Sequence, residues 1–269
     1  MAKRRTKKSR YLGRTQAFRR FREHIWRTHE LLDAGLVGIE EKSGKFDGIL
    51  DKFKGVKAPP GPRPRDYEPQ LKSAKDGKNI SLTMDSRTAA MLRSVLSSSK
   101  RRTDQIRFHL YSILAVSIWG AFETYVTMLF EELFALEPRM LMSQEQVTYA
   151  EILENEGDIV RLLIEKQLER IGHFGFVELC SYLDARIGFA FAQSMKRDLH
   201  DLYTVRNIIA HGSGLIRSDV EQRVPKAVPV EGGEIRVNKK YLNSAIACLE
   251  RAITSLEKHV DRKFYKQRS

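Results

Sequence analysis

The stretch YTVRNIIAHGSG, residues 203–214, holds side chains whose types and spacing suit acid–base chemistry. Arg206, Asn207 and His211 lie in a mostly apolar run that ends in glycine. A histidine exchanges protons near neutral pH, and a neighbouring arginine can hold an anionic group such as a phosphate. Together they suit proton transfer on a phosphodiester. The alternative is a helix end whose histidine hydrogen-bonds the last backbone carbonyls.

Spacing alone does not separate these two interpretations. An arginine followed by a histidine, with four to six residues between them, occurs at Arg19–His24, Arg22–His29, Arg102–His109 and Arg206–His211. Four matches in one basic chain show that the spacing discriminates poorly, so the surroundings of each pair must decide.

Helical geometry distinguishes the last pair. With about 100° between successive residues of a helix over 195–211, one sector is apolar and faces the core: Leu199, Leu202, Val205 and Ile209. A second stripe flanks it: His200, Tyr203, Asn207 and His211. Arg206 falls on the buried side, where a guanidinium is costly unless an acid or phosphate pairs with it.

Glu123 is the natural partner for Arg206. It is the only acid between Asp104 and Glu131, and it lies in the most apolar helix of the chain. We therefore expect the two side chains to meet. At the end of the 195–211 helix, Gly212 and Gly214 are the expected stop signal, and the unpaired carbonyls there favour a protonated imidazole.

The elements that must position these residues are mainly helices. Periodic apolar residues predict helices at about 14–42, 81–99, 102–136, 143–155, 158–171, 175–187, 195–211 and 239–261. The segment 55–79 holds five of the eight prolines and predicts an extended connector. Short β-branched runs around Gly232–Gly233 predict a hairpin. The expected fold is an all-α, up-and-down helical bundle with a small β-hairpin insertion before the last helix.

Charge and composition suggest five parts. Residues 1–22 form a basic arm, followed by an N-terminal helix at 23–54, a Pro-rich connector at 55–80, a helical domain at 81–262 and a basic tail at 263–269. The arm has ten Lys and Arg and no acid, out of a net charge of +13. Such an arm favours a polyanion, with nucleic acid before membrane, although it could also be a solvated tail. We expect Phe18, Phe21 and Trp26 to pack rather than stack on RNA.

Other kinds of site find little support. Cys180 and Cys248 read as core residues of a reducing cytoplasm, and no metal-ligand cluster or cofactor motif is visible. Residues 108–130 are long and apolar enough to cross a membrane, but Glu123 in their middle favours a buried bundle helix. We therefore expect a cytoplasmic protein without cofactor, metal or membrane partner.

Beyond these inferences, VRNIIAHGSG resembles the R-x4-6-H motif of HEPN domains, in its Arg-Asn-x-x-x-His form. The stretch SIWGAFETYVTMLFEEL resembles the upstream helix of the RiboL-PSP-HEPN branch, with its aromatic-x-x-x-Glu element. EIRVNKKYLNSAIACLERAI is similar to the hairpin and closing helix found downstream. The resemblance covers about residues 105–260 and leaves out the arm and the Pro-rich segment.

The resemblance implies a helical bundle that forms a homodimer or higher homo-oligomer and brings two motifs together across a cleft. Many members are metal-independent endoribonucleases of toxin–antitoxin or defence systems, so RNA, an antitoxin or a nucleotidyltransferase would be partners. His211 would then be the acid–base group, Arg206 would bind the scissile phosphate, Asn207 would orient the phosphate or His211, and Glu123 would hold Arg206. Other members are inactive modules that bind RNA or mediate oligomerisation. A DNA-associated defence role rests only on the basic arm.

Overall fold

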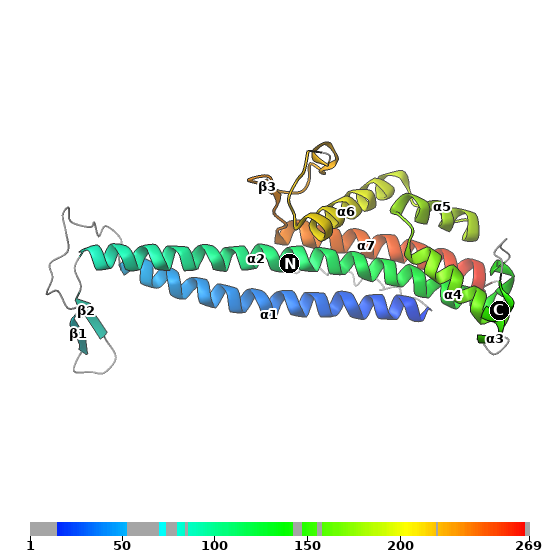
Figure 1. Ribbon diagram of the computed structural model, residues 1–269, viewed down its shortest axis with the longest axis horizontal. Coiled ribbons are helices and arrows are strands. Elements are labelled where there is room, and N and C mark those ends of the chain that lie inside the picture. The colour runs from blue at the N-terminus through cyan, green and yellow to red at the C-terminus, as the bar shows by residue number, and fades with distance from the viewer. Residues whose placement is uncertain are drawn as a thin grey trace, which may run out of the picture. The chain divides into compact units, whose positions relative to one another are not determined.

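The computed structural model describes residues 15–52, 70–73, 80–83, 86–141, 147–154, 158–218 and 220–266. Its helices and strands, shown in Figure 1, are α1 Gln16–Lys52, β1 Gln70–Ser73, β2 Ile80–Thr83, α2 Ser86–Leu136, α3 Tyr149–Glu154, α4 Ile159–Gly172, α5 Phe176–Ile187, α6 Gln193–Gly212, β3 Val230–Glu231, β4 Glu234–Ile235 and α7 Lys239–Val260. Three short helical turns complete them: Pro138–Leu141, Glu221–Arg223 and Asp261–Tyr265. The expected all-α bundle with a small β-hairpin before its last helix is confirmed.

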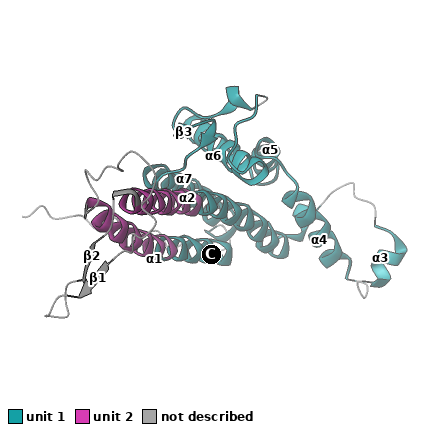
Figure 2. Ribbon diagram, turned by 60° about the vertical axis from the view of Figure 1, so that its left-hand side comes forward, with its two compact units in different colours: residues 1–30, 111–269 teal, residues 31–110 magenta. Residues whose placement is uncertain are grey.

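The chain divides into two compact units, coloured separately in Figure 2. One consists of residues 1–30 and 111–269, and the other of residues 31–110. These divisions fall inside α1 and α2, so they differ from the boundaries at 54, 80 and 262 that composition and charge suggested. All the residues proposed above as a site belong to the first unit.

α2 corrects the expectation of two helices at 81–99 and 102–136. It is one helix of 51 residues, because no proline or glycine interrupts the chain between Ser86 and Gly120. The serine-rich stretch near residue 98, between the two expected helices, is accommodated by hydrogen bonds back to the helix. Ser98 Oγ donates to the Ser94 carbonyl at 3.0 Å, and Thr103 Oγ1 donates to the Ser99 carbonyl at 3.1 Å.

The Pro-rich segment also departs from the prediction, because it includes strand β1 rather than only extended connector. β1 pairs with β2 as antiparallel strands, with Leu71 opposite Leu82. Residues 80–83, expected at a helix start, are therefore a strand, and the helix begins six residues after Ile80. The remainder of the connector, residues 55–69 and 74–79, lies outside the described residues.

The first unit has a continuous apolar core. In α2, side chains that are at most 2% exposed follow one another along the helix: Trp119, Phe122, Tyr125, Val126, Leu129, Phe130 and Leu133. Facing residues of α7 are fully buried: Leu249, Ala252, Ile253, Leu256 and Val260. Cys180 and Cys248 are buried free thiols, as expected. The centre of α2 is buried on most of its sides, and this is why it lacks a polar face.

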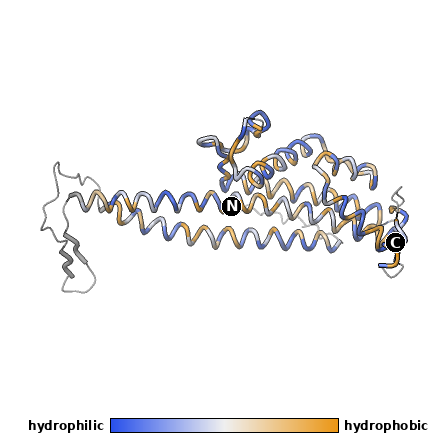
Figure 3. The backbone as a smooth tube through the Cα atoms, in the orientation of Figure 1, coloured by the Kyte–Doolittle hydropathy of each residue, from blue (hydrophilic) through white to orange (hydrophobic). Residues whose placement is uncertain are grey.

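Thr88–Leu136 is the one helical stretch among the described residues that is long and apolar enough to cross a membrane by length and composition. More than half of its most apolar window is buried inside the protein. Hydropathy along α1 alternates instead between hydrophobic and hydrophilic residues (Figure 3), as expected of an amphipathic helix.

The start of α1 is anchored within the first unit. Thr15 Oγ1 accepts the Phe18 amide at 3.0 Å, and the buried Glu257 carboxylate accepts both the amide and the hydroxyl of Thr15 at 2.9 Å. Glu132 accepts the next two amides, at 3.1 and 2.7 Å. Carboxylates at a helix N-terminus complement its partial positive charge. Residues 16–22 of the expected arm are thus helical, and residues 1–14 lie outside the described part.

The aromatic residues of this first segment divide between core and surface. Phe18 and Phe21 are buried, as expected, and Phe21 packs edge-on against Tyr125 with 6.1 Å between ring centroids. Trp26 does not lie in the core of this chain: 61% of it is exposed.

Candidate functional site

α6 carries the candidate residues and packs on α7 (Figure 1). Its buried residues are Leu199, Val205 and Ile208. The sequence assigned Ile209 to the core in place of Ile208, an error of one position around the helix. Leu202, also assigned to the core, is only half-buried.

Arg206 meets Glu123 as the sequence predicted. Arg206 Nη2 lies 3.3 Å from Glu123 Oε2, across 83 positions of the chain. The Arg206 side chain is 25% exposed and that of Glu123 is 41% exposed, so the pair lies at the edge of the core rather than inside it. An acid in the apolar helix and a cation on the buried side of α6 thereby neutralise each other.

Trp119 fixes the other oxygen of Glu123. Its indole Nε1 donates to Glu123 Oε1 at 2.7 Å, one helical turn away. The indole is itself held in an aromatic cluster: its ring centroid lies 5.4 Å from that of Tyr203 and 5.9 Å from that of Phe176. The aromatic-x-x-x-Glu element of the sequence thus orients the carboxylate that receives Arg206.

Asn207 has a defined amide orientation. Arg206 Nη1 donates to Asn207 Oδ1 at 2.9 Å. Because a guanidinium only donates hydrogen bonds, the atom facing it must be the oxygen. The Asn207 amide nitrogen is therefore left to donate to another group. Arg206 Nε is buried and has no hydrogen-bond partner among the described residues.

α6 ends with a left-handed residue, but that residue is not a glycine. Ser213 has φ 52°, and its amide donates to the Ile208 carbonyl. Gly214 follows with φ 87° and donates to the same carbonyl at 3.2 Å. The expected stop at Gly212 and Gly214 is thus correct in position, while Ser213 takes the strained conformation. His211, in the last turn, is exposed.

The β3–β4 hairpin holds the segment that follows α6. Ile235 donates its amide to the Gly214 carbonyl at 2.8 Å, and Ile216 donates to the Gly233 carbonyl at 2.9 Å. These bonds tie residues 214–216 to the turn of the hairpin. The hairpin therefore holds the first residues after the motif helix in place.

A groove with a volume of about 340 Å³ lies between α6 and this segment. The side of α6 contributes the stripe that the sequence predicted: His200, Tyr203, Asn207 and His211. The following segment contributes Leu215, Arg217, Val220 and Arg223. Apart from Tyr203, the ionisable side chains of the lining are histidines and arginines, without a carboxylate, so the groove favours an anion.

Two features of the groove differ from the sequence-based site. Arg206 is not among its lining residues, because Glu123 and Asn207 hold its guanidinium to one side. Arg217 and Arg223 line it but were missed, since they lie in an irregular segment with no periodicity to place them. The only feature of the sequence that points to them is that both lie within 12 residues of His211.

Within the described ranges, no three His, Cys, Asp or Glu side chains gather in a way that could hold a metal ion. Comparisons with protein-family models, with curated proteins and with solved structures found no match to this chain.

Proposed function

We propose that this protein is a metal-independent endoribonuclease of the HEPN type, which cleaves RNA by attack of a ribose 2′-OH on the adjacent phosphate. The observation that carries the proposal is the groove in which Asn207 and His211 stand side by side with arginines and without a carboxylate. Such a lining suits a phosphodiester and offers it a group for proton transfer. The Arg206–Glu123 pair behind the groove supports the same assignment.

His211 is the proposed acid–base group. It accepts the proton of the 2′-OH as the oxygen attacks phosphorus, or donates a proton to the departing 5′ oxygen. Its exposure at the end of α6 gives a substrate direct access. The bond between phosphorus and the 5′ oxygen breaks as that to the 2′ oxygen forms, which leaves a 2′,3′-cyclic phosphate and a 5′-hydroxyl. A second copy of the motif, across a homodimer, would supply the complementary histidine.

Asn207 and Arg206 have different proposed roles. The amide nitrogen of Asn207 is free to donate to a phosphate oxygen or to orient His211. Arg206, held by Glu123, orients Asn207 and adds positive charge near the anionic transition state. Arg217 and Arg223 are placed to contact the phosphates on either side. A direct contact of Arg206 with the scissile phosphate requires its guanidinium to turn toward the groove.

The wider setting follows only from the resemblance. We propose a cytoplasmic toxin, anti-phage or stress-defence effector, restrained by an antitoxin or a nucleotidyltransferase partner. An adjacent gene for either partner supports this setting.

The test is RNA cleavage by the purified full-length protein in EDTA. Wild type is expected to cleave, and His211→Ala and Arg206→Ala are expected not to, while both variants keep the wild-type circular dichroism spectrum. Binding of RNA without cleavage, unchanged by His211→Ala, supports instead an inactive module that binds RNA or mediates oligomerisation. The oligomeric state is measured in parallel by light scattering.

A further inference from the structure

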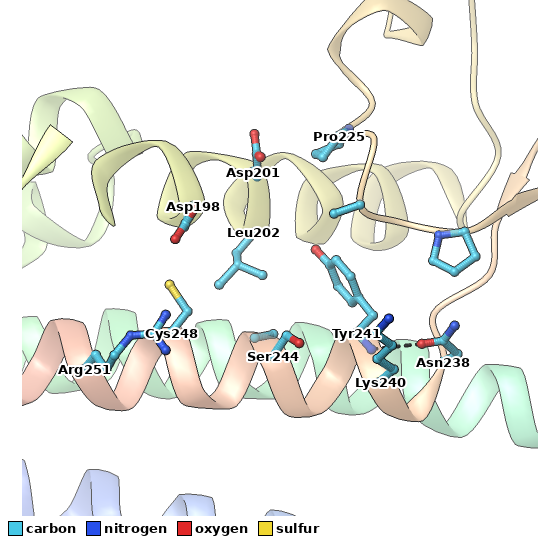
Figure 4. Close-up of a pocket in the computed structure, with 13 residues that line it drawn as sticks. Asp198, Asp201, Leu202, Pro225, Asn238, Lys240, Tyr241, Ser244, Cys248 and Arg251 are labelled. Carbon is cyan, nitrogen blue, oxygen red and sulfur yellow. Dashed lines mark hydrogen bonds between the residues drawn. The ribbon is translucent and has the colours of Figure 1, made fainter. Parts of the chain in front are cut away.

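A second cavity lies on the opposite side of α6 from the groove, with a volume of about 560 Å³. Asp198, Asp201 and Leu202 line it from α6, about half a turn of the helix from the stripe that bears His211. Figure 4 shows α7 as the facing wall, with Tyr241, Ser244, Cys248 and Arg251. The volume falls within the range of small-molecule sites, roughly 300–1,000 Å³.

Charges of both signs surround this cavity without pairing. Asp198 and Asp201 lie on α6, and Lys240 and Arg251 lie across from them on α7. None of the four forms a salt bridge with another described residue. The formal charges of this set cancel, unlike those of the groove on the other side of α6. A ligand that carries one positive and one negative group complements both walls at once, whereas a polyanion is repelled by the two aspartates.

Tyr241 leaves a hydrogen-bonding group unused between the helices. Its hydroxyl oxygen is buried and has no partner among the described residues, although its ring reaches from α7 toward α6 (Figure 4). A buried hydroxyl without a partner is unfavourable, because its desolvation is not compensated by a hydrogen bond. Burial, and then the nearby Asp201, raise the pKa of Tyr241, so the hydroxyl remains a donor at neutral pH. A ligand carboxylate would accept this bond.

Apolar groups make up part of the same walls. Leu202 projects into the cavity from α6 (Figure 4), and Pro225, Ala227 and Pro229 close it from the segment before the hairpin. These residues can cover an apolar or weakly polar part of a ligand but cannot satisfy a third charge. The lining thus defines a molecule with two opposite charges and a small uncharged body.

We propose that the cavity between α6 and α7 binds a small zwitterion of the amino-acid class. Its ammonium group pairs with Asp198 and Asp201, and its carboxylate pairs with Lys240 and accepts the Tyr241 hydroxyl. The proposal is independent of the nuclease function, because the site shares no side chain with the groove.

Isothermal titration calorimetry of the full-length protein, without RNA, tests this inference. Each standard L-amino acid is titrated separately, to about 10 mM, a range that detects even weak millimolar binding. At least one is expected to bind. Its N-acetyl derivative, which lacks the ammonium, and its amide, which lacks the carboxylate, are expected to bind at least about tenfold more weakly. Absence of binding by every amino acid, or equal binding of the blocked derivatives, would overturn the proposal.

Variants locate the site. Asp198→Asn and Lys240→Gln are each expected to weaken binding by about tenfold, and Tyr241→Phe by a smaller factor. Ser244→Trp, which fills the cavity without removing a charge, is expected to abolish binding. Asp184→Asn and Lys42→Gln change exposed charges outside the lining of this cavity and serve as matched controls. Wild-type affinity in both Asp198→Asn and Lys240→Gln, with native circular dichroism spectra, would contradict the assignment.

Discussion

Arg206 Nη2 lies 3.3 Å from Glu123 Oε2, and the same guanidinium donates to Asn207 Oδ1 at 2.9 Å. Trp119 holds the second oxygen of Glu123 at 2.7 Å. A chain of hydrogen bonds therefore runs from the aromatic core through Glu123 and Arg206 to Asn207 at the groove. The amide of Asn207 is oriented by residues that do not line the groove themselves.

The Arg206–Glu123 pair should contribute measurably to stability. A double-mutant cycle with Glu123→Gln and Arg206→Gln is expected to give a coupling energy of about 1 kcal/mol in urea unfolding, the upper part of the range for partly exposed pairs. Glutamine at 123 retains an acceptor for the Trp119 indole. The exposed pair Arg161–Glu165 is the control, with an expected coupling of about 0.3–0.5 kcal/mol. Zero coupling at 123 and 206 would show that the contact does not hold in solution.

Arg217 and Arg223 should bind RNA phosphates. Fluorescence anisotropy with a labelled single-stranded RNA, at several salt concentrations, is expected to show weaker binding for Arg217→Ala and Arg223→Ala. Each lost contact should flatten the dependence of log affinity on log salt by about 0.7. Arg197→Ala, an exposed position of α6 outside the groove, is the control. A salt slope equal to that of wild type in both groove variants would remove these residues from the proposed binding surface.

Ser213 is strained by its left-handed conformation, with φ 52°. Ser213→Gly is expected to raise the free energy of unfolding by about 0.5–1 kcal/mol, and Ser213→Val to lower it, because only glycine adopts this region without steric cost. Thermal and urea unfolding measure both. Gly214→Ala serves as a contrast: Gly214 has φ 87°, so alanine there should destabilise. Destabilisation by Ser213→Gly would contradict the assigned helix end.

His24 should make stability depend on pH. Burial, followed by the charge of Arg27, lowers its pKa below 6.5, while its Nε2 lies 3.0 Å from Ser117 Oγ. The unfolded chain therefore binds a proton more readily than the folded one. The stability that the neutral, partly buried His24 contributes is fully present above pH 6.5. It is lost as the pH falls from 6.5 through the lower pKa of the folded state. Urea unfolding of His24→Gln should show a weaker loss of stability across that window, and a curve parallel to wild type would contradict the assignment.

Much of the architecture was predictable because its signals are local. The helices from residue 158 onward follow apolar periodicity that begins and ends at caps and glycines, and the β3–β4 hairpin follows from Gly232–Gly233. α2 was divided wrongly because its apolar periodicity is interrupted near residues 97–101, where polar side chains instead bond back to the helix. The β1–β2 pairing was missed because a proline-rich composition says little about which short segments pair.

The site was predictable where burial forced a choice. Arg206 lies on the buried side of its helix, and Glu123 lies in an apolar helix with few cations nearby. Because an unpaired charge in such a setting is energetically unfavourable, their contact could be predicted. The acceptor role of Asn207 and the contributions of Arg217 and Arg223 depend on tertiary geometry. They follow from the fold of the segment after α6, whose first residues, 214–216, are held by the hairpin through backbone hydrogen bonds that no side-chain pattern encodes.

The most direct test of the proposed function is the chemistry of the RNA ends produced in EDTA. A defined single-stranded RNA is incubated with wild type, with His211→Ala and with His200→Ala, a second histidine of the same groove. Wild type and His200→Ala are expected to yield 2′,3′-cyclic phosphate and 5′-hydroxyl ends, identified by mass spectrometry, and His211→Ala is expected to yield none. Intact RNA with wild type, or the same products from His211→Ala, would contradict the account.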